Sequence, residues 1–162
     1  MHLKTTGAEH SPAQTEAIGI LMARLSAAMR ALGGKLVDVG SNSATLVVDW
    51  REDLVGNPES GALMNGVIAT MIDNVSAMAF FMATNCKSFP LATLDLRIEH
   101  MKPSQHGKPL HVHSECHKVG RQVAFFRATV WHPDEPDDMV ATGSGTFMVS
   151  ETDPTLSIQK PQ

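Results

Sequence analysis

The stretch that decides the fold is residues 63–84, which read LMNGVIATMIDNVSAMAFFMAT. On a helical wheel at about 100° per residue, its apolar side chains fill one half without a gap. This apolar half comprises Met64, Val67, Ile68, Met71, Ile72, Val75, Met78, Ala79 and Met82. The other half mixes polar, small and aromatic residues, and it contains no Lys, Arg or Glu, which a solvated helix face normally carries. We therefore expect a helix that is buried on most sides, with a few polar groups that need hydrogen-bond partners.

Shorter elements are expected before and after this helix. A first helix over residues 12–32 would begin at Ser11 and Pro12 and end at Gly33 and Gly34. The remaining elements are strands over residues 35–39 and 43–50 joined by a hairpin turn, a loop over 51–61, and strands over 91–101, 109–119, 121–131 and 139–149. This order predicts an α+β fold in which an antiparallel sheet curls around the central helix.

One domain is expected over residues 36–150. It would be preceded by an N-terminal segment and helix over residues 1–35 and followed by a loose C-terminal tail over residues 151–162. The chain has 162 residues, a length that buries about two-thirds of its surface on folding, so it can form a hydrophobic core without disulfides or metals.

Composition excludes several classes of protein. A formal net charge of −4 argues against a nucleic-acid-binding protein, which needs a basic face. No uninterrupted apolar run approaches the roughly 20 residues that span a bilayer, and the polar N-terminus lacks a signal-peptide segment, so a cytoplasmic location without a membrane is expected. The two cysteines, Cys86 and Cys116, are too few for a disulfide framework and are interpreted as small apolar fillers.

Three stretches carry a resemblance to a known family. The first is residues 57–73, NPESGALMNGVIATMID; the second is residues 91–98, LATLDLRI; the third joins residues 119–121, VGR, with residues 141–147, ATGSGTF. In order and spacing they resemble the hotdog-fold acyl-CoA thioesterases of the phenylacetate-degradation (PaaI-like) type, over about residues 36–149. The resemblance implies a curled sheet wrapped around a long helix. It also implies hydrolysis of an acyl-CoA thioester to a free acid and coenzyme A.

The first stretch departs from the family pattern where the helix begins. The family usually has an Asn or Gln, a short gap and then His-Gly-Gly, with an Asp or Glu nine residues after the His. Here Met64 stands in place of that His and Asn65 in place of the first Gly, while Gly66 matches the second Gly and Asp73 the carboxylate. If the family His helps to polarise the carbonyl group, that help is missing at position 64.

The resemblance implies catalytic roles for several residues. Asp73 would be the general base or the nucleophile, and the sequence leaves both roles open. The free backbone N–H groups near Asn65 and Gly66, at the positive end of the helix dipole, would stabilise the developing oxyanion. Asn57 would orient water or the carboxylate, and Ser76, about one turn after Asp73, would be a secondary hydrogen-bond partner.

Each of these residues also has a simpler structural interpretation. Asn57 is equally a turn residue before Pro58, and Asn65 fits a helix N-cap, which is compatible with an oxyanion role. Asp73 would be a solvated carboxylate stabilised by the helix dipole, which its apolar and small neighbours argue against. For Met64 we favour core packing over a place in the substrate pocket.

The resemblance also implies partners. Lys118 and Arg121 flank Gly120 at an expected tight turn, where they would meet the phosphates of coenzyme A, although a solvated turn explains the charges equally well. A homodimer or a dimer of dimers is implied, with the acyl and pantetheine groups in a tunnel between protomers. No cofactor is expected beyond the coenzyme A of the substrate.

Two other functions stay open at this point. His111, His113, Glu115 and His117 alternate on one strand face, where side chains two residues apart lie about 6.7 Å apart, so two imidazoles could share a metal. We favour a polar outer strand face and expect no metal site. The second alternative is a protein that binds acyl-CoA or an aromatic ligand without catalysis, because the His and first Gly of the family motif are missing.

Overall fold

The computed structural model describes residues 18, 20, 26–84 and 90–149. In chain order the elements are α2 (Ala27–Leu32), β1 (Lys35–Val39), β2 (Ser43–Val48), a 3-10 turn (Glu52–Leu54), β3 (Val55–Asn57), β4 (Ala62–Leu63), α3 (Asn65–Ala83), β5 (Pro90–His100), β6 (Leu110–Val119), β7 (Val123–Trp131) and β8 (Ala141–Val149). The expected N-terminal segment before residue 18 and the tail after residue 149 lie outside the described residues.

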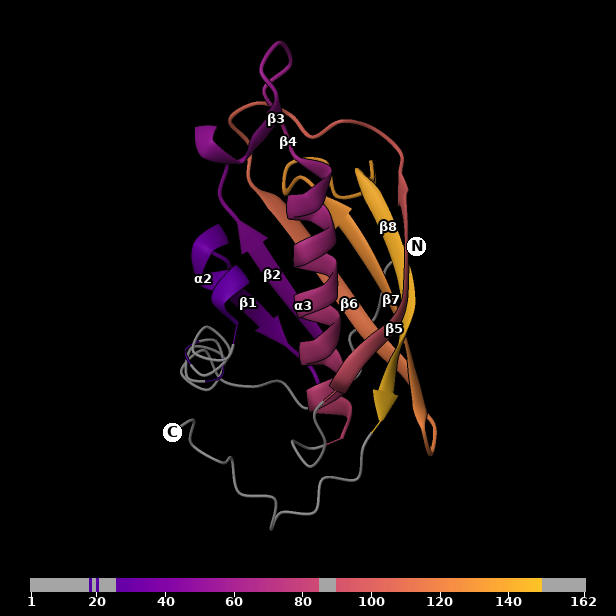
Figure 1. The fold of residues 1–162 in the computed structure, drawn as a ribbon. Coiled ribbons are helices and arrows are strands. Elements are labelled where there is room, and N and C mark those ends of the chain that lie inside the picture. Colours follow the sequence, from indigo (N-terminus) through magenta and orange to yellow (C-terminus); the bar gives the residue numbers. More distant parts are fainter. Residues whose placement is uncertain (1–17, 19, 21–25, 85–89, 150–162) are drawn as a thin grey trace, which may run out of the picture.

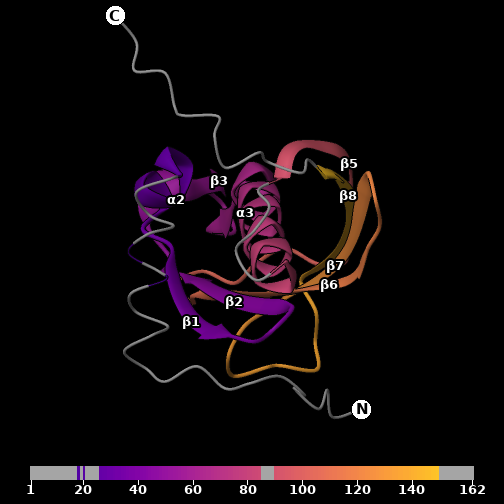
Figure 2. The same ribbon diagram turned by 90° about the horizontal axis from the view of Figure 1, so that it is seen from below.

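The main sheet has six antiparallel strands in the order β1-β2-β6-β7-β8-β5. Viewed along α3, the sheet curls around the helix, and α2 packs against α3 beside the sheet (Figures 1 and 2). β3 and β4 form a separate two-stranded pair near the start of α3. This arrangement confirms the predicted α+β hotdog fold.

The burial of α3 confirms the prediction from the helical wheel. Eleven of its residues are buried, including Phe80 and Phe81 from the half that is not uniformly apolar. The helix lies against β2, β6 and β7, whose inward side chains complete one hydrophobic core. By length and hydropathy alone α3 could cross a membrane, but 61% of its most apolar window is buried inside the fold, as in a core helix. Cys116 also fills this core, as expected, whereas Cys86 lies outside the described residues.

The N-terminal helix differs from its prediction because it is interrupted at Ser26. Residues 18 and 20 are helical, but Ser26 has an extended backbone and acts as the N-cap of α2. Its hydroxyl accepts a hydrogen bond from the Met29 N–H (3.2 Å) and donates one to Asn74 Oδ1 (2.6 Å). A serine that bonds to neighbouring groups in this way competes with a continuous helix. The predicted end of the helix is confirmed, since Gly33 is its left-handed C-cap at φ 67°.

The segment over residues 51–61 is more ordered than the loop predicted for it. It contains the 3-10 turn and β3, which pairs with β4 across a turn at residues 58–61. Gly61 closes this turn with a φ of 68°, and its N–H donates to the Asn57 carbonyl oxygen at 2.8 Å. Strands of two or three residues are too short to produce a readable alternation, which explains why they were not predicted.

The half-buried imidazole of His113, on the outer face of β6, makes the stability of the chain depend on pH. Burial lowers the pKa of His113 below its ordinary value of 6.5, against the raising effect of Asp38 and Glu115, and its Nδ1 lies 3.0 Å from Thr45 Oγ1. The unfolded chain therefore binds a proton more readily at this position than the folded chain. The neutral His113 ring contributes fully to the free energy of unfolding above about pH 6.5. This contribution is lost as the pH falls through the lower pKa that His113 has in the folded state.

We expect His113→Gln to weaken this acid sensitivity. The free energy of unfolding in urea should fall less between about pH 7 and about pH 5 in the variant than in the wild type, because Gln takes up no proton. His117→Gln changes an exposed ring on the same strand face and serves as the control. An unchanged pH dependence in His113→Gln would contradict this account.

Candidate functional site

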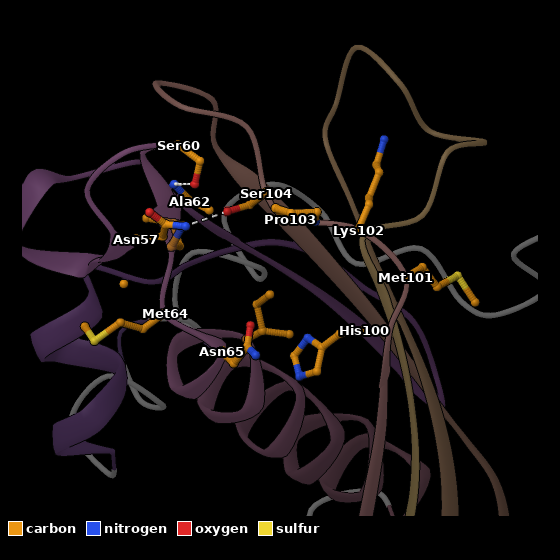
Figure 3. A pocket seen from close by; sticks show the side chains of 13 residues that line it. Asn57, Ser60, Ala62, Met64, Asn65, His100, Met101, Lys102, Pro103 and Ser104 are labelled. Atoms are coloured by element: carbon orange, nitrogen blue, oxygen red, sulfur yellow. Dashed lines mark hydrogen bonds between the residues drawn. The ribbon is translucent and has the colours of Figure 1, made fainter.

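A cavity of about 610 Å³ opens at the start of α3 (Figure 3). Its walls come from the β3–β4 pair, the first turns of α3, the end of β5 and the segment that follows β5. The polar side chains that line it are Asn57, Ser60, Asn65, His100, Lys102 and Ser104. Apolar groups from Ala62, Leu63, Met64, Ile68, Met101 and Pro103 complete the lining. The cavity thus combines an apolar wall with a few polar groups, as small-molecule sites do.

Two loops that are distant in sequence are fixed together at the rim. The hydroxyl of buried Ser104 accepts a hydrogen bond from the Leu63 N–H at 2.8 Å. The Trp50 indole N–H donates to the Gly61 carbonyl oxygen at 2.9 Å, and its ring lies 4.5 Å from the ring of His106. These contacts hold the turn before β4 against the segment after β5, so the cavity walls are preorganised.

The start of α3 faces this cavity without a capping side chain. Met64 occupies the N-cap position and makes no side-chain cap bond, while the Val67 N–H donates to the Met64 carbonyl oxygen at 2.9 Å. Asn65 is the first helical residue, so its interpretation as the N-cap is wrong. Gly66 follows it at an exposed position, where an added Cβ would meet nothing within 4 Å. The amides of the first turn form the positive end of the helix and favour a negative charge.

Asn57 and Met64 both lie at the cavity. The side chain of Asn57 accepts a hydrogen bond from the Glu59 N–H at 3.0 Å, which is the turn role considered for it, and it also lines the cavity. Met64 is 41% exposed and contributes to the apolar wall, so the favoured prediction of core packing is wrong. In Figure 3 its side chain extends away from Asn65 and His100.

Asp73 lies apart from the cavity within one chain. It stands eight residues after Asn65 on α3, about 12 Å along the helix axis, and is not among the residues that line the cavity. Its carboxylate is half-buried and accepts a hydrogen bond from Thr93 Oγ1 on β5 at 2.7 Å. Thr93 was not predicted as a partner. Its place in an alternating strand pattern gave no signal, because only the packing of β5 against α3 brings the two together.

Ser76 does not assist Asp73 in the folded chain. Its hydroxyl is fully buried and bonds to Ser114 Oγ on β6 at 2.8 Å. Ser114 in turn donates to the Arg127 carbonyl oxygen at 3.0 Å. The prediction that Ser76 contacts Asp73 or substrate is therefore wrong: three residues along a helix rotate the side chain by about 300°, which here directs Ser76 into the sheet.

The turn between β6 and β7 lies beyond the far end of α3 from the cavity (Figure 1). The predicted tight reversal at Gly120 is present, and its N–H donates to the Val123 carbonyl oxygen at 2.9 Å. Lys118 and Arg121 are exposed beside it. Ser114 on β6 lies beside α3, because it bonds to Ser76. Gly120 follows Ser114 by six residues, which is about 20 Å further along the strand direction. This turn and the cavity of the same chain therefore do not form one site.

The row of histidines on β6 is divided among separate partners. His113 contacts Thr45, the ring of His111 lies 5.8 Å from that of Trp131, and the ring of His117 lies 6.4 Å from that of Phe125. Within the described part of the chain, no group of three or more His, Cys, Asp or Glu side chains is placed to hold a metal ion. The metal-enzyme alternative therefore has no support from the geometry of these residues.

His100 is a cavity residue that the sequence did not reveal. It is the last residue of β5, and its imidazole points toward the side chain of Asn65 (Figure 3). A histidine at the end of an alternating strand carries no pattern that marks it as functional. Only the packing of β5 beside the start of α3 brings His100 to the cavity.

The region that contains this site is similar to known thioesterases. The family model described as "Thioesterase superfamily" matches residues 60–138, which include the start of α3, Asp73 and His100. Acyl-coenzyme A thioesterase 13 of Homo sapiens is 25% identical over 92 residues, which cover 57% of this chain and 64% of the relative. The match thus spans less than two-thirds of the length of that relative.

Solved structures show the same fold. Thioesterase superfamily member 2 from Mus musculus superposes with a TM-score of 0.71 at 21% identity, covering 86% of this chain and 98% of the other. The E. coli PaaI protein from the phenylacetic acid degradation operon has a TM-score of 0.70 at 16% identity, covering 88% of this chain and 99% of the other. Both likenesses confirm the hotdog fold.

Proposed function

We propose that this chain is a thioesterase that hydrolyses an acyl-CoA thioester to a free acid and coenzyme A. The observation that carries the proposal is the preorganised cavity at the uncapped start of α3, in a chain similar to an acyl-coenzyme A thioesterase. The thioester carbonyl would lie at the mouth, where the amides of Asn65 and Gly66 stabilise negative charge on its oxygen. The apolar wall, including Met64, would hold the acyl chain.

Asp73 supplies the carboxylate in this proposal, and it acts from a second copy of the chain. A separation of about 12 Å along α3 is too long for direct attack within one chain. Two antiparallel copies would place Asp73 of one copy near the first helical turn of the other. As general base, the carboxylate would remove a proton from water; as nucleophile, it would attack the carbonyl carbon. Its hydrogen bond to Thr93 holds it in place for either role.

The edge of the sheet supports a homodimer. β5 is an edge strand of 11 residues, and most of its described side chains are exposed, including Leu94 at 53%. Long exposed edge strands with apolar side chains pair with another chain unless something covers them. We expect light scattering at micromolar concentration to give at least twice the 17.5 kDa mass of the chain. A monomer at that concentration would contradict the shared site.

Coenzyme A would extend from the cavity to the surface. Lys118 and Arg121, beside Gly120, would meet its phosphates from a neighbouring copy, since they lie far from the cavity of their own chain. A dimer of dimers would bring such a turn into reach. No further cofactor is proposed.

A panel of acyl-CoA substrates tests the proposed function. Short, long and aromatic acyl-CoA thioesters are incubated with the chain, and the released thiol is followed with a thiol-reactive dye. Turnover of at least one thioester is the expected result. The exchange of the family His for Met64 favours a second candidate, a non-catalytic acyl-CoA-binding protein. Calorimetric binding without thiol release across the panel would favour that candidate and overturn the proposed function.

A further inference from the structure

The polar side chains of the cavity divide into two groups. Ser104 is bonded to the Leu63 N–H, Ser60 to the Ala62 N–H, and Asn57 to the Glu59 N–H. Lys102 is held in ion pairs with Glu135 and Asp138. All four side chains therefore already have partners within the chain, and the bond of Ser104 also joins two walls of the cavity.

Asn65 and His100 form the second group. Among the described residues neither side chain has a hydrogen-bond or ion-pair partner, and the two point toward each other at the cavity mouth (Figure 3). Asn65 begins α3, whereas His100 ends β5. They therefore approach the mouth from two elements and leave their hydrogen-bonding groups free for a bound molecule.

We propose that His100 is a catalytic residue whose ring N–H donates a hydrogen bond to the carbonyl oxygen of the bound thioester. The inference rests on the proposed function and adds to it the donor that Met64 does not supply. The imidazole faces the Asn65 side chain at the first turn of α3 (Figure 3), so a carbonyl oxygen bound between them would accept from both.

With this donor in place, hydrolysis begins with the attack of water on the thioester carbonyl group. The oxygen of water bonds to the carbonyl carbon, and the π pair moves onto the carbonyl oxygen, where His100 and the amides of Asn65 and Gly66 stabilise it. The proton of that water passes to the carboxylate of Asp73 in the second copy, which acts here as general base. The electron pair on the oxygen then re-forms the carbonyl double bond, and the C–S bond breaks. The thiolate of coenzyme A takes the proton from the carboxylate. His100 donates a hydrogen bond throughout and is left unchanged.

Two substitutions at one position test this role against a merely structural one. His100→Ala removes the donor, and kcat for the best acyl-CoA should fall about 100- to 1,000-fold with little change in KM, which is typical of a lost oxyanion donor. His100→Gln retains an N–H donor and should recover at least tenfold of that loss. His117→Gln, on the outer face of β6, should keep the wild-type kcat. Thermal unfolding of each variant confirms that it is folded.

Other results would overturn the inference. If His100→Ala keeps kcat within about threefold of the wild type while the wild type hydrolyses the thioester, His100 has no catalytic role although the proposed function stands. Equal losses in the Ala and Gln variants would assign it a packing role. Calorimetry with a ketone analogue, in which CH₂ replaces the thioester sulfur, separates the two proposals. Weaker binding by His100→Ala supports the carbonyl contact even if the wild type hydrolyses nothing; equal binding excludes the contact.

Discussion

Asp73→Asn is expected to lower kcat for the best acyl-CoA by at least about a hundredfold, which is within the range for loss of a general base. Asn has nearly the same size and shape as Asp but cannot take up the proton of the attacking water or serve as a carboxylate nucleophile. The Thr93 hydroxyl can still donate to the amide oxygen of Asn. The side chain is half-buried and lies outside the core cluster, so the fold should be unaffected.

The measurement is thiol release under saturating substrate, together with a thermal unfolding curve for each protein. Asp49→Asn is the matched control, because Asp49 is exposed and pairs with Lys35 at the surface, far from the cavity lining. We expect that control to retain the wild-type rate. Wild-type turnover by Asp73→Asn would exclude this carboxylate from the reaction, whatever the fate of the cavity and of His100.

Gly145→Ala is expected to be the most destabilising single-methyl change in the sheet. A Cβ at this position of β8 would overlap the carbonyl oxygen of Asp95 on β5 and lie 2.7 Å from Cζ of Phe126. A backbone oxygen in a paired strand cannot move without breaking the pairing. We therefore expect a loss of about 3 kcal/mol in the free energy of unfolding, the upper end of the typical cost of overpacking.

Two other glycines make this prediction specific. At Gly143, on the same strand, the nearest atom is Cγ2 of the Ile72 side chain at 2.8 Å, which can shift, so Gly143→Ala should cost less. At Gly66 an added Cβ meets nothing within 4 Å, and Gly66→Ala should stabilise α3 by about 0.5 kcal/mol. Urea unfolding of the three variants gives the comparison. Equal stability of the Gly143 and Gly145 variants would show that the strand backbones yield as easily as a side chain.

The local pattern of apolar, polar and turn residues was sufficient to predict much of this fold. The unbroken apolar half of residues 63–84 and the absence of Lys, Arg and Glu required a helix enclosed by other elements. Six of the strands had alternation or turn signals that predicted them to within about two residues. The break at Ser26 was missed because it depends on Asn74, which lies 48 residues away.

The site was less accessible to sequence reasoning. Asn57, Met64, Asn65, Gly66 and Asp73 fall within one short motif, and the resemblance of that motif to the hotdog-fold thioesterases indicated them. The motif did not predict that Asp73 lies outside the cavity of its own chain and bonds to Thr93 of β5. Ser76 seemed to be a neighbour of Asp73 by number, but the rotation of the helix directs it toward Ser114 in the core.

The sequence by itself determined that residues 65–83, at the centre of the predicted stretch, form a buried helix inside a curled antiparallel sheet, because hydrophobic periodicity is a local property of the chain. Only the tertiary structure decided which side chains meet at the end of that helix. His100 and Asn65 are 35 residues apart and come together because β5 runs back along α3. Asp73 accepts its hydrogen bond from Thr93 for the same reason. Contacts between separate elements depend on how those elements pack, and no spacing within either element records them.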